Sequence, residues 1–235
     1  MSKSGKHESI TLHVIVYNIT FVLMCRGHTF RKAFLELGDV RSLIPEHVNV
    51  MALTATATKA TRRAVCQVLG MTSPAVIAQI PDRPNIKYSM HANPGPLEEA
   101  FAPLVDEIKT KRTTMDRVII YCRTYDNCSM IYLFLNSKLG GEITEPRNAI
   151  DLARYRMVDM FTACTTTSVK DSILERFCIQ NSSLRVVVAT VAFGMGLDCP
   201  NVRRIIHWGP PGDIEQYLQE TGRAGRDGLP SQAVL

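Results

Sequence analysis

The chain has 235 residues, of which 46% are hydrophobic and 21% are charged, and its formal net charge is +5 at pH 7. This length can bury one full domain and part of another, and the mild basic excess is compatible with a phosphate-bearing partner without requiring one. The seven cysteines include no Cys-x-x-Cys pair, which argues against a zinc knuckle and predicts reduced intracellular thiols.

An apolar segment over residues 10–25 resembles a signal peptide or a membrane anchor. However, it contains His13 and Asn18, it is shorter than the ~20 residues that a membrane span needs, and no small-residue cleavage site follows it. We therefore expect a β-rich or unrelated leader and no membrane association.

The next elements are predicted from periodicity. Residues 48–58 begin with alternating β-branched positions and end in small residues, which predicts a buried strand that runs into a loop. Residues 59–69 have helical spacing, and Gly70 is placed to end the helix. Five prolines within residues 72–96 predict a connector, and we place a domain boundary near Pro81–Asn85.

Beyond this boundary, short apolar runs alternate with helical patterns. Strands are predicted over 117–122, 184–190 and 202–208, and helices over 127–139, 168–178 and 213–222. Ser168 and Asp171 have the spacing of a capping box, Asp213 is a predicted N-cap and Gly222 ends the last helix. This alternation indicates a parallel sheet that is covered on both faces, with ligands at the carboxyl ends of the strands.

Two arginines carry the strongest chemical signal. In the segment 219–228 (QETGRAGRDG), Arg223 and Arg226 follow a helix and are interleaved with Gly222 and Gly225. Guanidinium groups are planar, permanently charged and bidentate, so they suit phosphate, and glycine lets the backbone approach a ligand. A glycine-rich surface turn with solvated charges is the alternative.

A second glycine-containing loop follows the strand over 184–190. There, Gly194 and Gly196 flank Met195, and Asp198 comes next. Such a loop can present backbone N–H groups and a carboxylate to a nucleotide. An ordinary tight turn is the alternative.

Four ordered motifs resemble those of RecQ-family superfamily 2 DNA helicases. Residues 51–58 (MALTATAT) resemble motif III, and residues 82–90 (DRPNIKYSM) resemble the entry to the second RecA-like domain. Residues 117–124 (RVIIYCRT) resemble motif IV, and residues 189–235 resemble motifs V and VI. The likeness begins near residue 27 and is weakest over 140–169.

The resemblance implies an α/β fold, a RecA-like (P-loop NTPase-type) parallel sheet flanked by helices. Residues 82–235 would be the helicase C-terminal, second RecA-like domain. Residues 1–81 would be a leader and the truncated C-terminal part of an incomplete first RecA-like domain.

The resemblance also implies roles in nucleotide chemistry. Arg223 and Arg226 would reach the γ-phosphate of ATP as arginine fingers. Gln219 would help to sense nucleotide or DNA, and Gly196 and Asp198 would lie at the ATP edge of the cleft.

Further implied roles concern DNA and coupling. Arg123 and Thr190 would contact the DNA backbone without regard to base sequence, and Thr54 and Thr56 would couple hydrolysis to domain movement. Taken singly, Arg123 also fits a solvated charge, and the two threonines also fit small residues at a tight strand end.

The departures from the family pattern bear on activity. The Gly5-Lys6 pair lacks the first glycine and the hydroxyl of a P-loop, and no DEAH-like box precedes residues 51–58. ATP and Mg²⁺ would therefore serve the intact family, with neither held by this chain alone. Residues 160–167 replace a DNA-contact motif, and we assign them no DNA role.

The resemblance implies an ATP-dependent 3′-to-5′ DNA helicase of repair and recombination, acting on single-stranded or forked DNA in the nucleus, or in the nucleoid or cytoplasm. This chain would be inactive alone and would need the missing first helicase domain as a partner. Two alternatives stay open: a non-catalytic module that binds DNA or a protein partner, and a truncated gene product.

Overall fold

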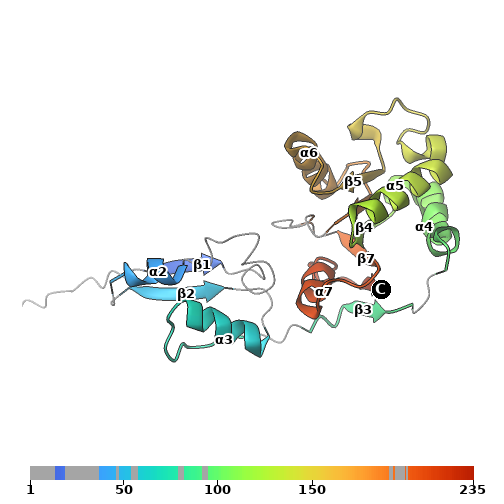
Figure 1. Cartoon of the computed structure of the whole chain (residues 1–235). Helices are drawn as coiled ribbons and strands as arrows, with labels where there is room; N and C mark the ends of the chain where they lie inside the picture. The colour runs from blue at the N-terminus through green and yellow to red at the C-terminus, as the bar shows by residue number, and fades with distance from the viewer. Residues whose placement is uncertain are drawn as a thin grey trace, which may run out of the picture. The chain divides into compact units, whose positions relative to one another are not determined.

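A computed structural model of the chain describes residues 14–18, 37–45, 48–53, 58–78, 82–91, 95–190, 193, 199 and 201–235 (Figure 1). The chain divides into two compact units, Met1–Pro81 and Asp82–Leu235. Most of the apolar leader lies outside the described residues, although a strand occupies Val14–Asn18. Within the described ranges, no helix is both long and apolar enough to cross a membrane.

The first unit is a small parallel pair of strands with two helices. Its elements are β1 (Val14–Asn18), α2 (Leu37–Ser42), β2 (Asn49–Leu53) and α3 (Lys59–Val68). Thr58 caps α3, because its hydroxyl accepts a hydrogen bond from the Thr61 amide at 3.1 Å. Gly70 follows the helix with a φ of +58°, so the prediction of a helix that ends at this glycine is confirmed.

The second unit contains one six-stranded sheet. Its elements are β3 (Ile86–Ser89), α4 (Leu97–Lys111), β4 (Arg117–Cys122), α5 (Tyr125–Leu139), β5 (Val158–Phe161), α6 (Thr167–Cys178), β6 (Val186–Ala189), β7 (Val202–Trp208), α7 (Ile214–Thr221) and β8 (Ser231–Val234). The strand order is β3-β8-β7-β4-β6-β5, and every pairing is parallel. The predicted parallel α/β sheet is confirmed.

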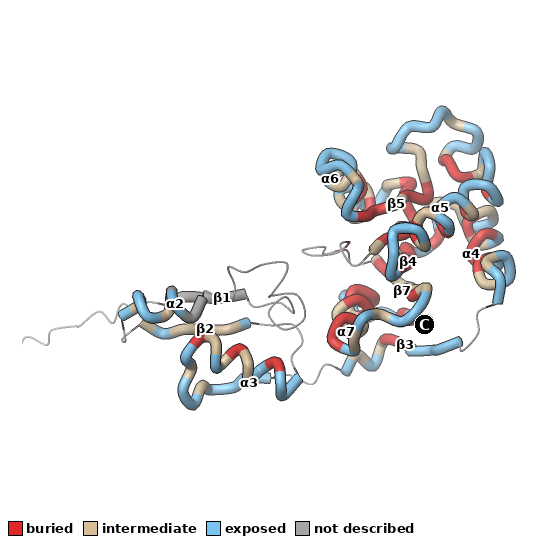
Figure 2. Tube along the Cα trace, in the orientation of Figure 1, coloured by how far each residue is buried: buried red, intermediate tan, exposed pale blue. Residues whose placement is uncertain are grey.

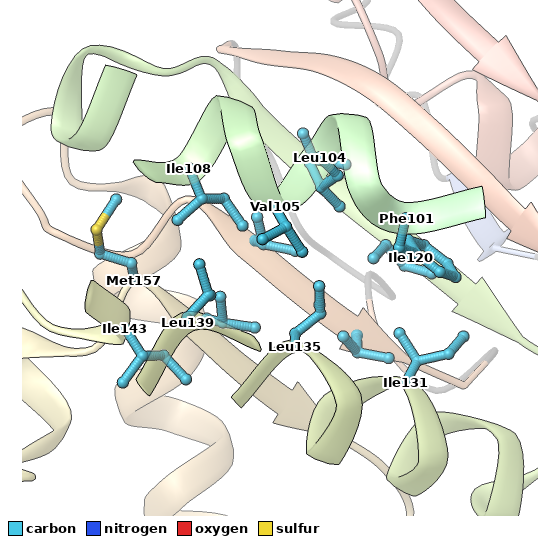
Figure 3. Packing of buried hydrophobic residues seen from close by; sticks show 14 of the residues in the cluster. Phe101, Leu104, Val105, Ile108, Ile120, Ile131, Leu135, Leu139, Ile143 and Met157 are labelled. Atoms are coloured by element: carbon cyan, nitrogen blue, oxygen red, sulfur yellow. The ribbon is translucent and has the colours of Figure 1, made fainter. Parts of the chain in front are cut away.

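Strand β4 shows why the core has two halves. Its side chains alternate across the sheet, so Val118 and Ile120 pack with α4 and α5, whereas Ile119 and Tyr121 pack on the opposite face with α6. Figure 3 shows the first half, where apolar side chains of α4 and α5 meet over the sheet. Every residue of β4 and β6 is buried, which explains their largely apolar sequences. The edge strand β3 is by contrast mostly exposed (Figure 2).

Several elements differ from the sequence-based expectations. Strand β3 lies within the expected connector; it is an edge strand in which only Ile86 is buried, so it lacks an apolar run. The 15-residue helix α4 contains Pro103, which interrupts the helical signal. Strands β5 and β8 have only four residues each, too few for a clear period.

The expected capping box at Ser168 is wrong. Helix α6 begins at Thr167 and its N-cap is Thr166, which makes no side-chain capping hydrogen bond. Ser168 therefore lies inside the helix, where its hydroxyl cannot cap the first turn. By contrast, Asp213 does cap α7, because its carboxylate accepts from the Gln216 amide at 2.8 Å.

The distribution of the core makes a prediction about protease resistance. Limited proteolysis of the whole chain should leave a product from near Asp82 to Leu235, because both large core clusters lie in the second unit. The described part of the first unit buries only a small cluster around Val65 and Leu69. Mass spectrometry identifies the product, and early cuts within β4, β6 or β7 would contradict this expectation.

Candidate functional site

The carboxyl ends of β4 and β6 bring two predicted site residues together. Tyr121 pairs with Ala189, so Arg123 and Thr190 follow the ends of adjacent strands. Arg123 is exposed, whereas Thr190 is half-buried and its amide donates to the carbonyl of Phe161 at 3.2 Å. One exposed cation and one hydroxyl thus lie at the carboxyl ends of two adjacent strands. The roles of Arg123 and Thr190 toward nucleic acid stay predictions.

The loop after β6 is anchored in the core. Two described residues of this loop, Phe193 and Cys199, are buried. The Phe193 ring contacts Phe161 and Phe177, with centroids at 4.9 and 5.6 Å, and the Cys199 thiol donates to the Phe177 carbonyl at 3.1 Å. Burial raises the pKa of this thiol to about 11, which keeps it protonated.

Four of the predicted site residues lie outside the described residues. These are Gly196 and Asp198, expected at the ATP edge of the cleft, and Thr54 and Thr56, expected to couple hydrolysis to movement. Their roles stay predictions.

The segment 222–230, which we call the arginine loop, connects α7 to β8. The Gly225 amide donates to the carbonyl of Val202, the first residue of β7, at 2.9 Å. Helix α7 therefore runs back against the strand direction, and the backbone of the loop reaches the amino ends of the strands. The backbone of this segment thus lies away from the carboxyl ends of the strands, where ligands are expected to bind.

The two arginines of the loop have different surroundings. Arg223 is only 8% exposed, and its guanidinium lies close enough to the phenol of Tyr121 to act on the pKa of that phenol. Burial raises the pKa of that phenol, while the charges of Arg223 and Arg226 oppose the shift. Arg226 is exposed, and Gln219 on α7 is half-buried. The structure thus gathers the three residues around one helix end and places one guanidinium inside and one at the surface.

A buried polar network ties α7 to the sheet. The Nε2 atom of His207, on β7, lies 2.8 Å from Oε2 of Glu220. The other oxygen of Glu220 accepts from the Gln216 amide group at 2.9 Å, and Gln216 in turn accepts from the amide of Gly212 at 3.2 Å. When Glu220 is a carboxylate, which can only accept, Nε2 of His207 is the donor of this bond.

This network also reaches the central strand. The His207 ring stacks on Tyr121 with centroids 5.6 Å apart and an interplanar angle of 23°. The Tyr121 hydroxyl donates to the Phe193 carbonyl at 3.1 Å, which links β4 to the loop after β6. Sequence reasoning missed both residues, although each is a polar-tipped ring near the carboxyl end of a strand with an apolar centre, and that is a usable signal.

Comparisons with curated proteins give helicase relatives. A family model described as the helicase conserved C-terminal domain matches residues 99–228. The ATP-dependent DNA helicase RecQ of Pasteurella multocida is 37% identical over 209 residues, which cover 89% of this chain and 29% of that protein. The bifunctional 3′-5′ exonuclease/ATP-dependent helicase WRN of Mus musculus is 33% identical over 233 residues, 97% of this chain and 15% of that protein. The chain spans less than a third of the length of either relative.

Solved helicase structures share the fold. Mycobacterium smegmatis helicase Lhr bound to ssDNA and AMP-PNP has a TM-score of 0.69 at 19% identity and covers 95% of this chain and 28% of its own. S. cerevisiae Dbp5 bound to RNA and ADP BeF3 has a TM-score of 0.67 at 17% identity, with 95% and 54% covered. At these identities the likeness concerns the fold alone, and it confirms the RecA-like architecture.

The packing around Gly225 predicts a difference between two glycines of the arginine loop. A Cβ at Gly225, whose φ is +57°, would lie 2.4 Å from Nδ2 of Asn85 and 2.7 Å from Oγ of Ser231. Gly228 also has a positive φ, +81°, but a Cβ there meets nothing within 4 Å. Gly225→Ala should therefore destabilise the fold by roughly 3 kcal/mol and Gly228→Ala by only about 1 kcal/mol, measured by urea denaturation. Equal losses would show that the close packing at Gly225 contributes nothing.

Proposed function

Because the chain belongs to the family of the helicase conserved C-terminal domain, we propose that residues 82–235 form the second motor domain of an ATP-dependent 3′-to-5′ DNA helicase. The RecQ relatives confirm the resemblance that the four motifs predict. The observation that carries the proposal is the arginine loop, on which an exposed Arg226 follows a buried Arg223.

Arg226 is the residue that we assign to phosphate. Its exposed guanidinium can meet the γ-phosphate of ATP held by another domain, and it would stabilise the charge that spreads over the phosphoryl oxygens in the transition state. Arg223 would act from inside, because its buried guanidinium lies near Tyr121 and so brings the loop close to the central strand. Gln219, on the same helix, would sense nucleotide or DNA.

The remaining parts of an ATPase site would come from a partner. The 235 residues contain no G-x-x-x-x-G-K-[ST] sequence. In the described part of the chain, no group of three or more His, Cys, Asp or Glu side chains could hold a metal ion. We propose that a first helicase domain supplies the phosphate-cradling loop, its lysine and the acid that holds Mg²⁺, with Gly196 and Asp198 at the facing edge and Thr54 and Thr56 coupling hydrolysis to movement.

Nucleic acid would bind at the carboxyl ends of the adjacent strands β4 and β6. Arg123 offers a charge to a phosphate and Thr190 offers a hydroxyl, a combination that suits backbone contact without base recognition. The substrate would be single-stranded or forked DNA, and the setting DNA repair or recombination in the nucleus or nucleoid. The M. smegmatis helicase of similar fold is bound to ssDNA, which supports this assignment.

A non-catalytic DNA-binding module is the second candidate. It is favoured by one observation, that both Arg123 and Thr190 belong to a single unit and need no residue from another domain to lie together. The two candidates differ in whether Arg226 contributes to ATP turnover.

The first prediction from the proposed function concerns ATP turnover. The 235-residue chain alone should show no DNA-stimulated ATPase activity, because an arginine finger accelerates only a reaction that other groups have positioned. Adding a first domain from a RecQ relative should yield turnover, and Arg226→Ala should lower that turnover by ~10³-fold or more.

DNA binding is the control in this assay, since Arg226→Ala should leave it nearly unchanged. Turnover by the isolated chain that is lost on Arg226→Ala would reveal a nucleotide site within these residues. Turnover in the mixture that is indifferent to Arg226→Ala would remove the arginine finger from the proposal.

The second prediction concerns DNA binding and salt. The chain should bind single-stranded DNA with a Kd in the range of ~10⁻⁴–10⁻⁶ M, and the affinity should fall steeply with salt, because phosphate contacts release counterions. Arg123→Ala should lower the slope of log K against log salt by about 0.7, the amount expected for one lost phosphate contact.

Arg154→Ala is the matched control. This arginine is exposed and stacks on Tyr155 at 4.7 Å, and it precedes β5, at the amino ends of the strands. Fluorescence anisotropy at several salt concentrations measures the slopes. Equal slopes for the two variants, or a marked preference for one base sequence, would contradict the proposal that DNA binds at the carboxyl ends of β4 and β6.

A further inference from the structure

The first residues of the second unit hold the arginine loop. We propose that Arg83 and Asn85 are positioning residues that lock this loop in the shape required for Arg226 to reach a phosphate. The inference rests on the proposed function. It adds that side chains distant in sequence from the arginine loop fix the position of the Arg226 guanidinium.

Arg83 binds the backbone of the loop through its guanidinium. Its Nη2 atom donates to the carbonyl oxygen of Gly225 at 2.7 Å and to that of Ala224 at 3.4 Å, and Nη1 lies 3.5 Å from the oxygen of Gly222. These carbonyls follow the last turn of α7, where the helix dipole concentrates negative charge. A planar cation with several donors can gather three such carbonyls, which otherwise repel one another.

Asn85 completes the lock with its side-chain amide. Its Nδ2 atom donates to the carbonyl oxygens of Gly225 at 2.8 Å and Leu229 at 3.0 Å, on either side of Arg226. The carbonyl of Asn85 accepts from the Ser231 amide at 2.8 Å, where β8 begins beside β3. The side chain therefore spans the loop from Gly225 to its junction with β8.

The glycine content of the loop makes this lock necessary. Gly222, Gly225 and Gly228 leave the backbone many alternative conformations, and each one would place the Arg226 side chain differently. The contact is also close enough to exclude any side chain at Gly225, because a Cβ there would lie 2.4 Å from Nδ2 of Asn85. Residues 83–85 lie at the start of the second unit, which begins at Asp82. Hydrogen bonds thus join the start of this unit to the arginine loop.

Steady-state ATP hydrolysis tests the lock. The assay mixes the 235-residue chain with a first domain from a RecQ relative, with single-stranded DNA present. Arg83→Ala should lower kcat by about 10- to 100-fold while the KM for ATP changes by less than about twofold, because a displaced finger loses transition-state contact and not ground-state binding. Arg83→Lys, which keeps the charge but reaches fewer carbonyls, should restore part of the loss.

Hydrogen exchange on the 235-residue chain supplies a readout without activity. In Arg83→Ala, the Gly225 amide should exchange about 10-fold faster or more, since hydrogen bonds to a charged group are lost, while the amides of β4 keep their protection. Asn85→Ala is the second variant, with the same expected direction in both measurements. Lys87→Ala, which removes an exposed cation two residues further along, is the control and should change neither.

The outcomes separate this inference from the proposed function. If the wild-type mixture turns over and Arg226→Ala abolishes turnover, but Arg83→Ala and Asn85→Ala keep the wild-type kcat, only the lock is overturned. If the wild-type mixture never turns over, the proposed function fails, and the lock fails with it. Should Arg83→Ala not fold, as judged by circular dichroism, Arg83→Lys and Asn85→Ala decide the question.

Discussion

The parallel sheet imposes one constraint from which the site geometry follows. Successive parallel strands require a crossover, so α7 must run back from the end of β7 to the start of β8. The arginine loop consequently meets the amino ends of the strands, whereas Arg123 and Thr190 lie at the carboxyl ends. The backbone of the arginine loop therefore lies at one end of the sheet, while the Arg223 side chain lies near Tyr121, toward the other end.

The junction between α7 and the sheet consists of polar groups that satisfy one another. Glu220 is buried, and an unpaired buried carboxylate costs several kcal/mol. His207 and Gln216 each occupy one of its oxygens, and the bond from His207, on β7, forms only when helix and strand are in register. An apolar junction would tolerate small shifts of α7 along the sheet. The polar junction does not tolerate such shifts. Because α7 is held in place, the arginine loop begins at a fixed position.

The sequence predicted most of the second unit, for reasons that the structure makes plain. Strands 117–122 and 202–208 were predicted to the residue because burial on both faces, or on alternate positions, leaves a strong apolar pattern. Strand β3 was not, because an edge strand with one buried residue carries no such pattern. For the candidate site, Arg223 and Arg226 were singled out by their spacing. The contribution of Arg83 could not be, since it depends on a contact across some 140 positions of the chain.

Burial separates two chemically identical side chains on this loop. Arg223 and Arg226 are three residues apart and both flanked by glycine, so sequence alone gives them equal claims on a phosphate. The first is buried near Tyr121, where little solvent reaches its charge. The second is exposed, so a phosphate can approach it from solvent. A buried guanidinium is restricted by the groups packed around it, whereas an exposed one can be reached from solvent. The pair therefore supports a division between a residue that positions and a residue that contacts substrate, and Arg83 serves the first of these tasks from outside the loop.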